Sequence, residues 1–101
     1  MNNKRSELKK YSNVDIAQKK AYEYLGVDAK LLLSPHSSKK FRIYDPYKQK
    51  YIDFGQMGYQ DYTKHEDEER RERYLKRATK IKGNWQDNPY SANNLSINIL
   101  W

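Results

Sequence analysis

The 101-residue sequence contains no cysteine, and its longest aliphatic run, Leu31 to Leu33, is three residues long. The lack of cysteine excludes disulfides and thiolate metal sites, which suits a reducing compartment. A run of three apolar residues is too short for a signal peptide or a membrane-spanning helix. From these absences we expect a soluble protein with no membrane span.

Recognisable catalytic and metal-binding motifs are lacking as well. The two histidines, His36 and His65, are far apart and neither belongs to a recognisable metal-site pattern. The four carboxylates from Glu66 to Glu69 would point around a helix rather than at one cation. No glycine-rich phosphate loop or nucleophile accompanies His65. We therefore expect a protein that is not an enzyme and that uses no metal, cofactor or small-molecule substrate.

Charge is what the sequence has in abundance. Charged residues make up 33% of the chain and hydrophobic ones 37%, which predicts one small domain with a thin core. Of the formal net charge of +7, residues 1–40 contribute +5, from nine Lys or Arg against four Asp or Glu. Such an excess attracts phosphate backbones and acidic protein surfaces alike. The alternative is a solvated basic surface that aids solubility.

The N-terminal third is predicted to be an arm followed by a helix. Residues 1–12 are polar and lack apolar periodicity, so we expect a basic arm that is disordered until bound. Apolar residues then recur at helical spacing from Val14 to Leu25, with Ser12 as the predicted N-cap and Gly26 as the C-terminal stop.

A β-hairpin is predicted at residues 40–55, because apolar and polar residues alternate on either side of the Asp45–Pro46 turn. Its apolar face would consist of Phe41, Ile43, Ile52 and Phe54. The preceding segment, residues 27–33, is apolar but too short for periodicity to distinguish a helical turn from an extended piece, and residues 34–40 form a linker.

A charged helix over residues 66–81 has the clearest signal. Thr63 and Glu66 fit a capping box, and the acidic residues that follow suit the positive end of the helix dipole. Acidic residues precede basic ones by four positions, which predicts the ion pairs Glu66–Arg70, Asp67–Arg71, Glu69–Arg73 and Glu72–Lys76. The predicted buried stripe is Tyr74, Leu75, Ala78 and Ile81, and Gly83 is the predicted stop.

Ser91 is predicted to cap a last helix, whose apolar face would be Ala92, Leu95, Ile99 and Leu100. A strand is the competing interpretation, because alternate residues from Leu95 to Ile99 are apolar. We prefer the helix, since only that pattern includes Ala92 and Leu100. The predicted fold is therefore α+β: residues 40–101 form a small domain with a hairpin packed on the charged helix and the C-terminal helix, and residues 1–39 form a basic arm with a helix and a linker.

Two sets of side chains are candidates for binding. The cations predicted to contact nucleic acid or an acidic partner are Lys4, Arg5, Lys9, Lys10, Lys39, Lys40, Lys76, Arg77, Lys80 and Lys82. The aromatic residues predicted to form a protein interface are Tyr44, Tyr47, Tyr51, Tyr59, Tyr62, Trp85, Tyr90 and Trp101. Tyrosines also stack on nucleobases. We place protein contacts first because they need no special spacing and the chain lacks the aromatic motif of single-strand binding sheets.

Residues 40–101 resemble a family of small proteins encoded by nucleocytoplasmic large DNA viruses, in which a basic hairpin leads to a phrase FG..GY.DYT.H.D..RR..Y..R and a terminal LS…LW. The residues that carry the resemblance are Phe54, Gly55, Gly58, Tyr59, Asp61, Tyr62, Thr63, His65, Asp67, Arg70, Arg71, Tyr74, Arg77, Leu95, Ser96, Leu100 and Trp101. The family has no established reaction, so the resemblance implies a viral context rather than a mechanism.

The function expected from this resemblance is that of a structural protein of a virus particle, a minor capsid or internal component held by other virion proteins. Its location would be the virion and, before assembly, the host cytoplasm. The alternative is a basic protein that binds DNA or RNA through its arm during genome packaging or expression. We expect no enzymatic activity in either case.

Overall fold

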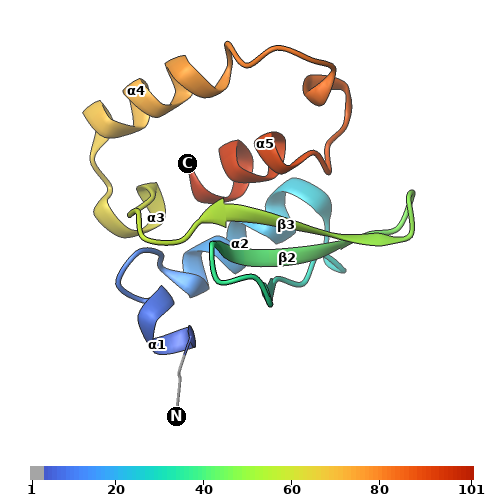
Figure 1. Cartoon of the computed structure of the whole chain (residues 1–101), viewed down its shortest axis with the longest axis horizontal. Helices are drawn as coiled ribbons and strands as arrows, with labels where there is room; N and C mark the ends of the chain where they lie inside the picture. The colour runs from blue at the N-terminus through green and yellow to red at the C-terminus, as the bar shows by residue number, and fades with distance from the viewer. Residues whose placement is uncertain (1–3) are drawn as a thin grey trace.

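A β-hairpin lies at the centre of the computed structural model, which describes residues 4–101 (Figure 1). The elements in chain order are α1 (Lys4–Leu8), α2 (Val14–Leu25), β1 (Leu32–Leu33), β2 (Lys39–Asp45), β3 (Lys50–Gln56), α3 (Tyr62–His65), α4 (Glu68–Ala78), the short 3-10 helix η1 (Trp85–Asp87), α5 (Ala92–Leu95) and the π-helical turn η2 (Ser96–Leu100). The fold class is α+β, as predicted.

The predicted hairpin is confirmed. Its register aligns the apolar residues on one face: Phe41 with Phe54 and Ile43 with Ile52. In the turn, the Asp45 carboxylate accepts hydrogen bonds from the backbone N–H groups of Tyr47 at 2.9 Å and Lys48 at 3.3 Å, which is how aspartate commonly stabilises a turn. A third, two-residue strand, β1, pairs antiparallel with β2. The extended interpretation therefore holds for the end of segment 27–33.

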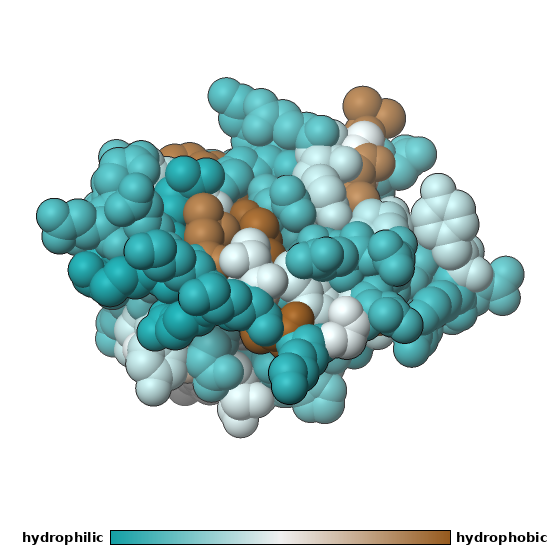
Figure 2. All heavy atoms as spheres, turned by 90° about the horizontal axis from the view of Figure 1, so that it is seen from above, coloured by the Kyte–Doolittle hydropathy of each residue, from teal (hydrophilic) through white to brown (hydrophobic). Residues whose placement is uncertain are grey.

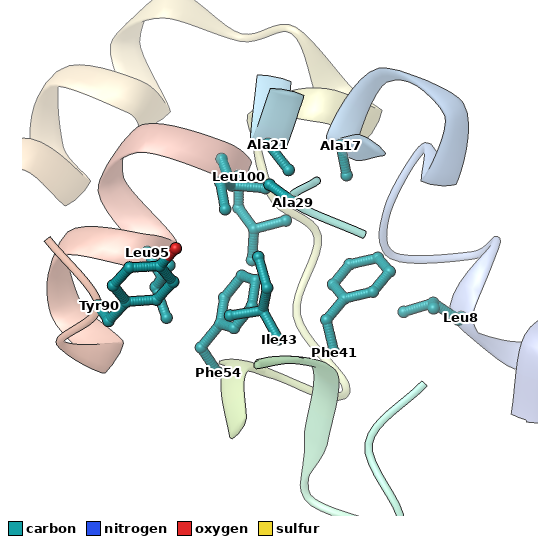
Figure 3. Close-up of a cluster of buried hydrophobic side chains, with 11 residues drawn as sticks. Leu8, Ala17, Ala21, Ala29, Phe41, Ile43, Phe54, Tyr90, Leu95 and Leu100 are labelled. Carbon is teal, nitrogen blue, oxygen red and sulfur yellow. The ribbon is translucent and has the colours of Figure 1, made fainter. Parts of the chain in front are cut away.

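The apolar face of the hairpin is covered by helices from both ends of the chain (Figure 3). The side chains of Phe41 and Phe54 are at most 1% exposed, and their ring centroids lie 6.0 Å apart. The N-terminal part of the chain contributes Leu8, Ala17, Ala21 and Ala29, and the C-terminal part contributes Tyr90, Leu95, Ile99 and Leu100. Residues 1–39 and 40–101 thus contribute to the same core.

The N-terminal segment differs from its prediction. Disorder is wrong for residues 4–8, which form α1 because the Leu8 side chain is fully buried in the core; residues 1–3 lie outside the described residues. The N-cap of α2 is Asn13, whose side chain accepts a hydrogen bond from the N–H of Ile16, and not Ser12. The predicted stop at Gly26 is confirmed.

The charged helix is shorter than predicted and begins differently. Glu66 adopts a left-handed conformation, φ 53°, which breaks the helix after α3. The capping residues are two aspartates, Asp61 for α3 and Asp67 for α4, so the Thr63–Glu66 capping box is wrong. α4 ends at Ala78, three residues before the predicted Ile81.

The C-terminal segment is helical, and the strand interpretation is wrong. The Ser91 side chain accepts a hydrogen bond from the N–H of Asn94, as predicted for its cap. The helix then widens into the π-helical turn η2, which buries Ile99 and Leu100. None of the helices within residues 4–101 combines the length and the apolar character needed to cross a membrane.

Candidate functional site

A cleft of about 600 Å³ separates α4 from the end of β3 and from the C-terminal helical segment. Arg70, Arg73 and Arg77 line it from α4, whereas Phe54 and Gly55 line it from β3. Seen from above, the surface of the molecule is mostly hydrophilic, with a few hydrophobic atoms visible between hydrophilic side chains (Figure 2). The volume falls within the range of ligand-binding pockets, about 300–1,000 Å³.

The cleft exists because α4 is tied to the rest of the chain near its two ends. Near its N-terminal end, Arg71 Nε donates to the Trp101 backbone oxygen at 2.7 Å, and about halfway along the helix the Tyr74 ring stacks on Trp101, with centroids 4.2 Å apart and planes 9° apart. At its C-terminal end, Asn93 Nδ2 donates to the Ala78 oxygen at 3.0 Å. Between these contacts, α4 stands away from the hairpin.

Three arginines form a row on the cleft side of α4, which we call the arginine row: Arg70, Arg73 and Arg77. Their spacing of three and four residues places them on one helix face. The predicted i, i+4 ion pairs are absent from the described residues, where the ion pair within α4 joins Arg71 to Glu68 at 3.9 Å. Within residues 4–101, the guanidinium groups of the arginine row therefore have neither a hydrogen bond nor an ion pair.

Lys40 lies beside the same cleft but in a different environment. Its side chain is 2% exposed, and its Nζ lies 2.8 Å from the Asp61 carboxylate, which is 1% exposed. Asp61 also accepts hydrogen bonds from the hydroxyl groups of Ser12 and Thr63 and from the Thr63 N–H at 3.0 Å. Burial lowers the pKa of Lys40, and the neighbouring Asp61 charge opposes that shift. This network joins the N-terminal segment, the hairpin and α3.

His65 supports the start of α4. Its Nδ1 accepts a hydrogen bond from the N–H of Asp67 at 2.9 Å, and its ring lies 5.1 Å from the Trp101 ring. The Nε2 atom is buried and has no hydrogen-bond partner within the described residues. Burial, together with the positive charge of Arg70, lowers the pKa of His65. The neutral ring is thus the form that fits this site.

The structure distributes the predicted cations over different environments. Lys39 and Arg77 line the cleft. The exposed cations outside it are Arg5, Lys9, Lys10, Lys76, Lys80 and Lys82. Lys4 Nζ donates to the backbone oxygens of Ser34 and His36, the latter at 2.7 Å. The predicted binding role of Lys40 has to be corrected, because an ammonium buried against Asp61 is not available to an outside partner.

Arg70 and Arg73 were not among the predicted binding residues, because each has an acidic residue four positions earlier that was expected to pair with it. Glu66, however, lies outside α4, and no bond joins Glu69 to Arg73 within residues 4–101. The sequence feature that could have identified them is the spacing of the arginines, because Arg70, Arg73 and Arg77 share one helix face with the half-buried Tyr74.

The predicted aromatic interface divides into two groups. The side chains of Tyr44, Tyr47, Tyr51 and Tyr59 are exposed. The other four make internal contacts. Tyr62 donates to the Glu68 carboxylate and Trp85 Nε1 to the Ile81 oxygen at 2.6 Å. Tyr90 is in the core, and Trp101 stacks on Tyr74.

Within residues 4–101, no three His, Asp or Glu side chains gather in a way that could hold a metal ion. The chain matches no curated protein and no solved structure. The viral resemblance therefore stays a prediction. Residues 29–78, which include β1 to α4 and with them Lys40, Asp61 and the arginine row, match the model of a family of unknown function, DUF5754.

Proposed function

We propose that the chain is a non-enzymatic nucleic-acid-binding protein and that the cleft beside α4 is its binding site. Its main support is the arginine row, Arg70, Arg73 and Arg77, because all three side chains line one cleft and none of them has an ion pair within residues 4–101. The planar guanidinium donates two parallel hydrogen bonds to a phosphate, which makes arginine the usual residue for this contact.

The charge of the cleft supports the same function. Its lining contains one acidic residue, Asp61, whose carboxylate is bound to Lys40. Lys39 adds a further cation at the opposite wall. An anionic ligand would therefore meet a positive potential without acidic competition inside the cleft. The exposed cations Arg5, Lys9 and Lys10 would add nonspecific attraction from the N-terminal segment.

The test compares two triple variants of the full chain that lose the same charge. Arg70→Gln/Arg73→Gln/Arg77→Gln removes the arginine row, and Lys76→Gln/Lys80→Gln/Lys82→Gln removes three exposed cations outside the cleft. The readout is the fluorescence anisotropy of a labelled oligonucleotide between 50 and 300 mM salt.

We expect the wild-type affinity to fall steeply with salt. The arginine-row variant should bind at least ten times more weakly at low salt, and its log–log salt slope should be smaller by about 2, from about 0.7 per phosphate contact. The lysine variant should retain most of the affinity, since its cations lie outside the cleft. Equal losses in the two variants would contradict a site in the cleft, and no binding by the wild type would contradict the function.

A structural role in a virus particle is the second candidate, and the exposed tyrosines favour it. Tyr44 and Tyr51 form an edge-on pair on the hairpin, 5.3 Å between centroids, and Tyr47 is 83% exposed at the turn. Tyrosine is enriched in protein interfaces, and the sequence resembles a viral family. Mass spectrometry of purified particles tests this role, and absence of the chain from them would contradict it.

A further inference from the structure

We infer that the cleft beside α4 selects single-stranded nucleic acid over duplex. This inference rests on the proposed function and goes further, because it names the form of nucleic acid that the arginine row can reach. The two forms of nucleic acid differ in width. A cleft of about 600 Å³ holds a short strand or a small molecule, whereas a double helix is too wide to enter it.

The charges on α4 oppose a duplex that would lie against its outer surface instead. Glu68, Glu69 and Glu72 are exposed on α4 and are not part of the cleft lining. A rigid duplex placed across the outside of the helix would bring its phosphates close to these carboxylates. A flexible strand avoids them by entering the cleft, where the arginine row lies.

The length of the arginine row suits a few nucleotides. Arg70 and Arg77 are seven residues apart, which at 1.5 Å per residue is about 10 Å along the helix axis. A stacked strand advances about 3.4 Å per nucleotide, so the row corresponds to about three steps. Each guanidinium can then contact a separate phosphate.

Aromatic side chains at the cleft supply surfaces for bases. Tyr59 lines the cleft and is 69% exposed. Tyr74 also lines it, and its position is fixed by the stacking on Trp101. Bases stack on such rings without sequence preference, and they are accessible for this only in a single strand. In this binding mode, a single strand contacts the arginine row of α4 with its phosphates and stacks a base on Tyr59.

The experiment measures binding of the full-length protein to three labelled probes in the same buffer: a 12-nucleotide oligothymidine, a 12-base-pair duplex and a poly-glutamate peptide of equal length. Two matched variants, Tyr59→Leu in the cleft and Tyr51→Leu on the hairpin, are measured with the oligothymidine. Tyr51 is 48% exposed and does not line this cleft, so it controls for the loss of a surface tyrosine.

We expect the oligothymidine to bind at least tenfold more tightly than the duplex or the peptide. Tyr59→Leu should weaken its binding roughly 5-fold or more, the effect of losing one stacked base, and Tyr51→Leu should leave it unchanged. Duplex binding as tight as single-strand binding, or equal effects of the two variants, would overturn the inference while the proposed function stands. Binding of the peptide alone would overturn both.

Discussion

Lys40 and Arg73 are basic residues at opposite walls of one cleft, and they differ in burial and in whether an acidic residue pairs with them. Lys40 is buried, bound to Asp61 and joined through it to Ser12 and Thr63. Arg73 is exposed, and no bond to another described residue is found for its guanidinium. A positive charge thus stabilises the fold where it is buried with a partner and is available for binding where it is exposed and unpaired.

The same contrast separates the elements that carry these residues. The hairpin buries Phe41, Ile43 and Phe54 in the core, whereas α4 buries only Ala78 among its eleven residues. Most helical stability in proteins comes from packing of an apolar face. We therefore expect the hairpin to determine global stability. We expect the backbone amides of α4 to exchange hydrogen most readily and to become protected when a ligand binds.

The largest predicted effect breaks the buried pair. Asp61→Ala leaves the Lys40 ammonium buried with the Tyr11 backbone oxygen as a neutral acceptor and without an opposite charge, and removing one member of such a pair typically costs about 3–5 kcal/mol. Urea denaturation at pH 7 measures the change in the free energy of unfolding. The control is Asp28→Ala at an exposed position, which should stay within about 0.5 kcal/mol. Similar losses of stability in both variants would show that the buried carboxylate of Asp61 contributes no more than an exposed one.

The next effect concerns the hairpin wall of the cleft. Gly55 has a φ of 82°, and a Cβ atom there would lie 2.9 Å from Leu100 Cδ1. Gly55→Ala should destabilise the protein by about 1–3 kcal/mol through backbone strain and collision. Gly58 has a φ of 99° but open space around it, so Gly58→Ala measures strain alone. The first variant should unfold at lower urea concentration than the second.

On α4, a substitution in the arginine row should affect ligand binding more than stability. Arg73→Gln should change the free energy of unfolding by no more than about 0.5 kcal/mol, because an exposed residue without partners contributes little to stability. It should nevertheless weaken oligonucleotide binding several-fold, since one charge-assisted contact is lost. Paired denaturation and anisotropy measurements check both parts. A large loss of stability with intact binding would assign Arg73 to the fold instead.

The smallest effect is a dependence on pH at the junction of α3 and α4. The pKa of His65 is lowered in the folded state by burial and by Arg70, and Asp61, Asp67 and Lys40 are the other charged groups near its ring. The unfolded chain therefore takes up the proton more readily. The stabilisation by neutral His65 is complete above about pH 6.5, the ordinary histidine pKa, and is lost as the pH falls through the lower folded-state value.

His65→Gln isolates this contribution. The urea midpoint of the wild type should fall more between pH 7.5 and pH 5 than that of the variant, because only the wild type loses a neutral imidazole bonded to the Asp67 N–H. Parallel decreases in the two proteins would mean that other groups cause the acid sensitivity.

The sequence was sufficient to predict the parts of the fold that depend on local patterns. The hairpin followed from alternation around Asp45, the C-terminal end of α2 from Gly26, and the start of the last helix from Ser91. These signals act within a few residues, so no knowledge of the tertiary structure was needed. The N-terminal helix was missed because its formation depends on one side chain, Leu8, that is buried by distant elements.

The candidate site was predicted less well, because it depends on which charges meet in space. Lys40 was predicted to bind a partner because of its charge, but in the structure it is buried and paired with Asp61, 21 positions later in the chain. Arg70 and Arg73 have acidic residues four positions earlier in the sequence, but Glu66 lies in the break before α4, and Glu69 and Arg73 form no ion pair within the described residues although both lie in α4. Exposure and pairing of a charge are tertiary properties.

Hydrogen–deuterium exchange of the full chain, with and without a saturating 12-nucleotide single strand, shows whether the strand binds in the cleft beside α4. We predict slower exchange in α4, residues 68–78, and in residues 54–61, most of which line the cleft, with no change in the hairpin turn around Tyr47. Protection of the turn and of Tyr44 and Tyr51, with α4 unaffected, would contradict it and would place binding on the tyrosine-bearing surface of the hairpin.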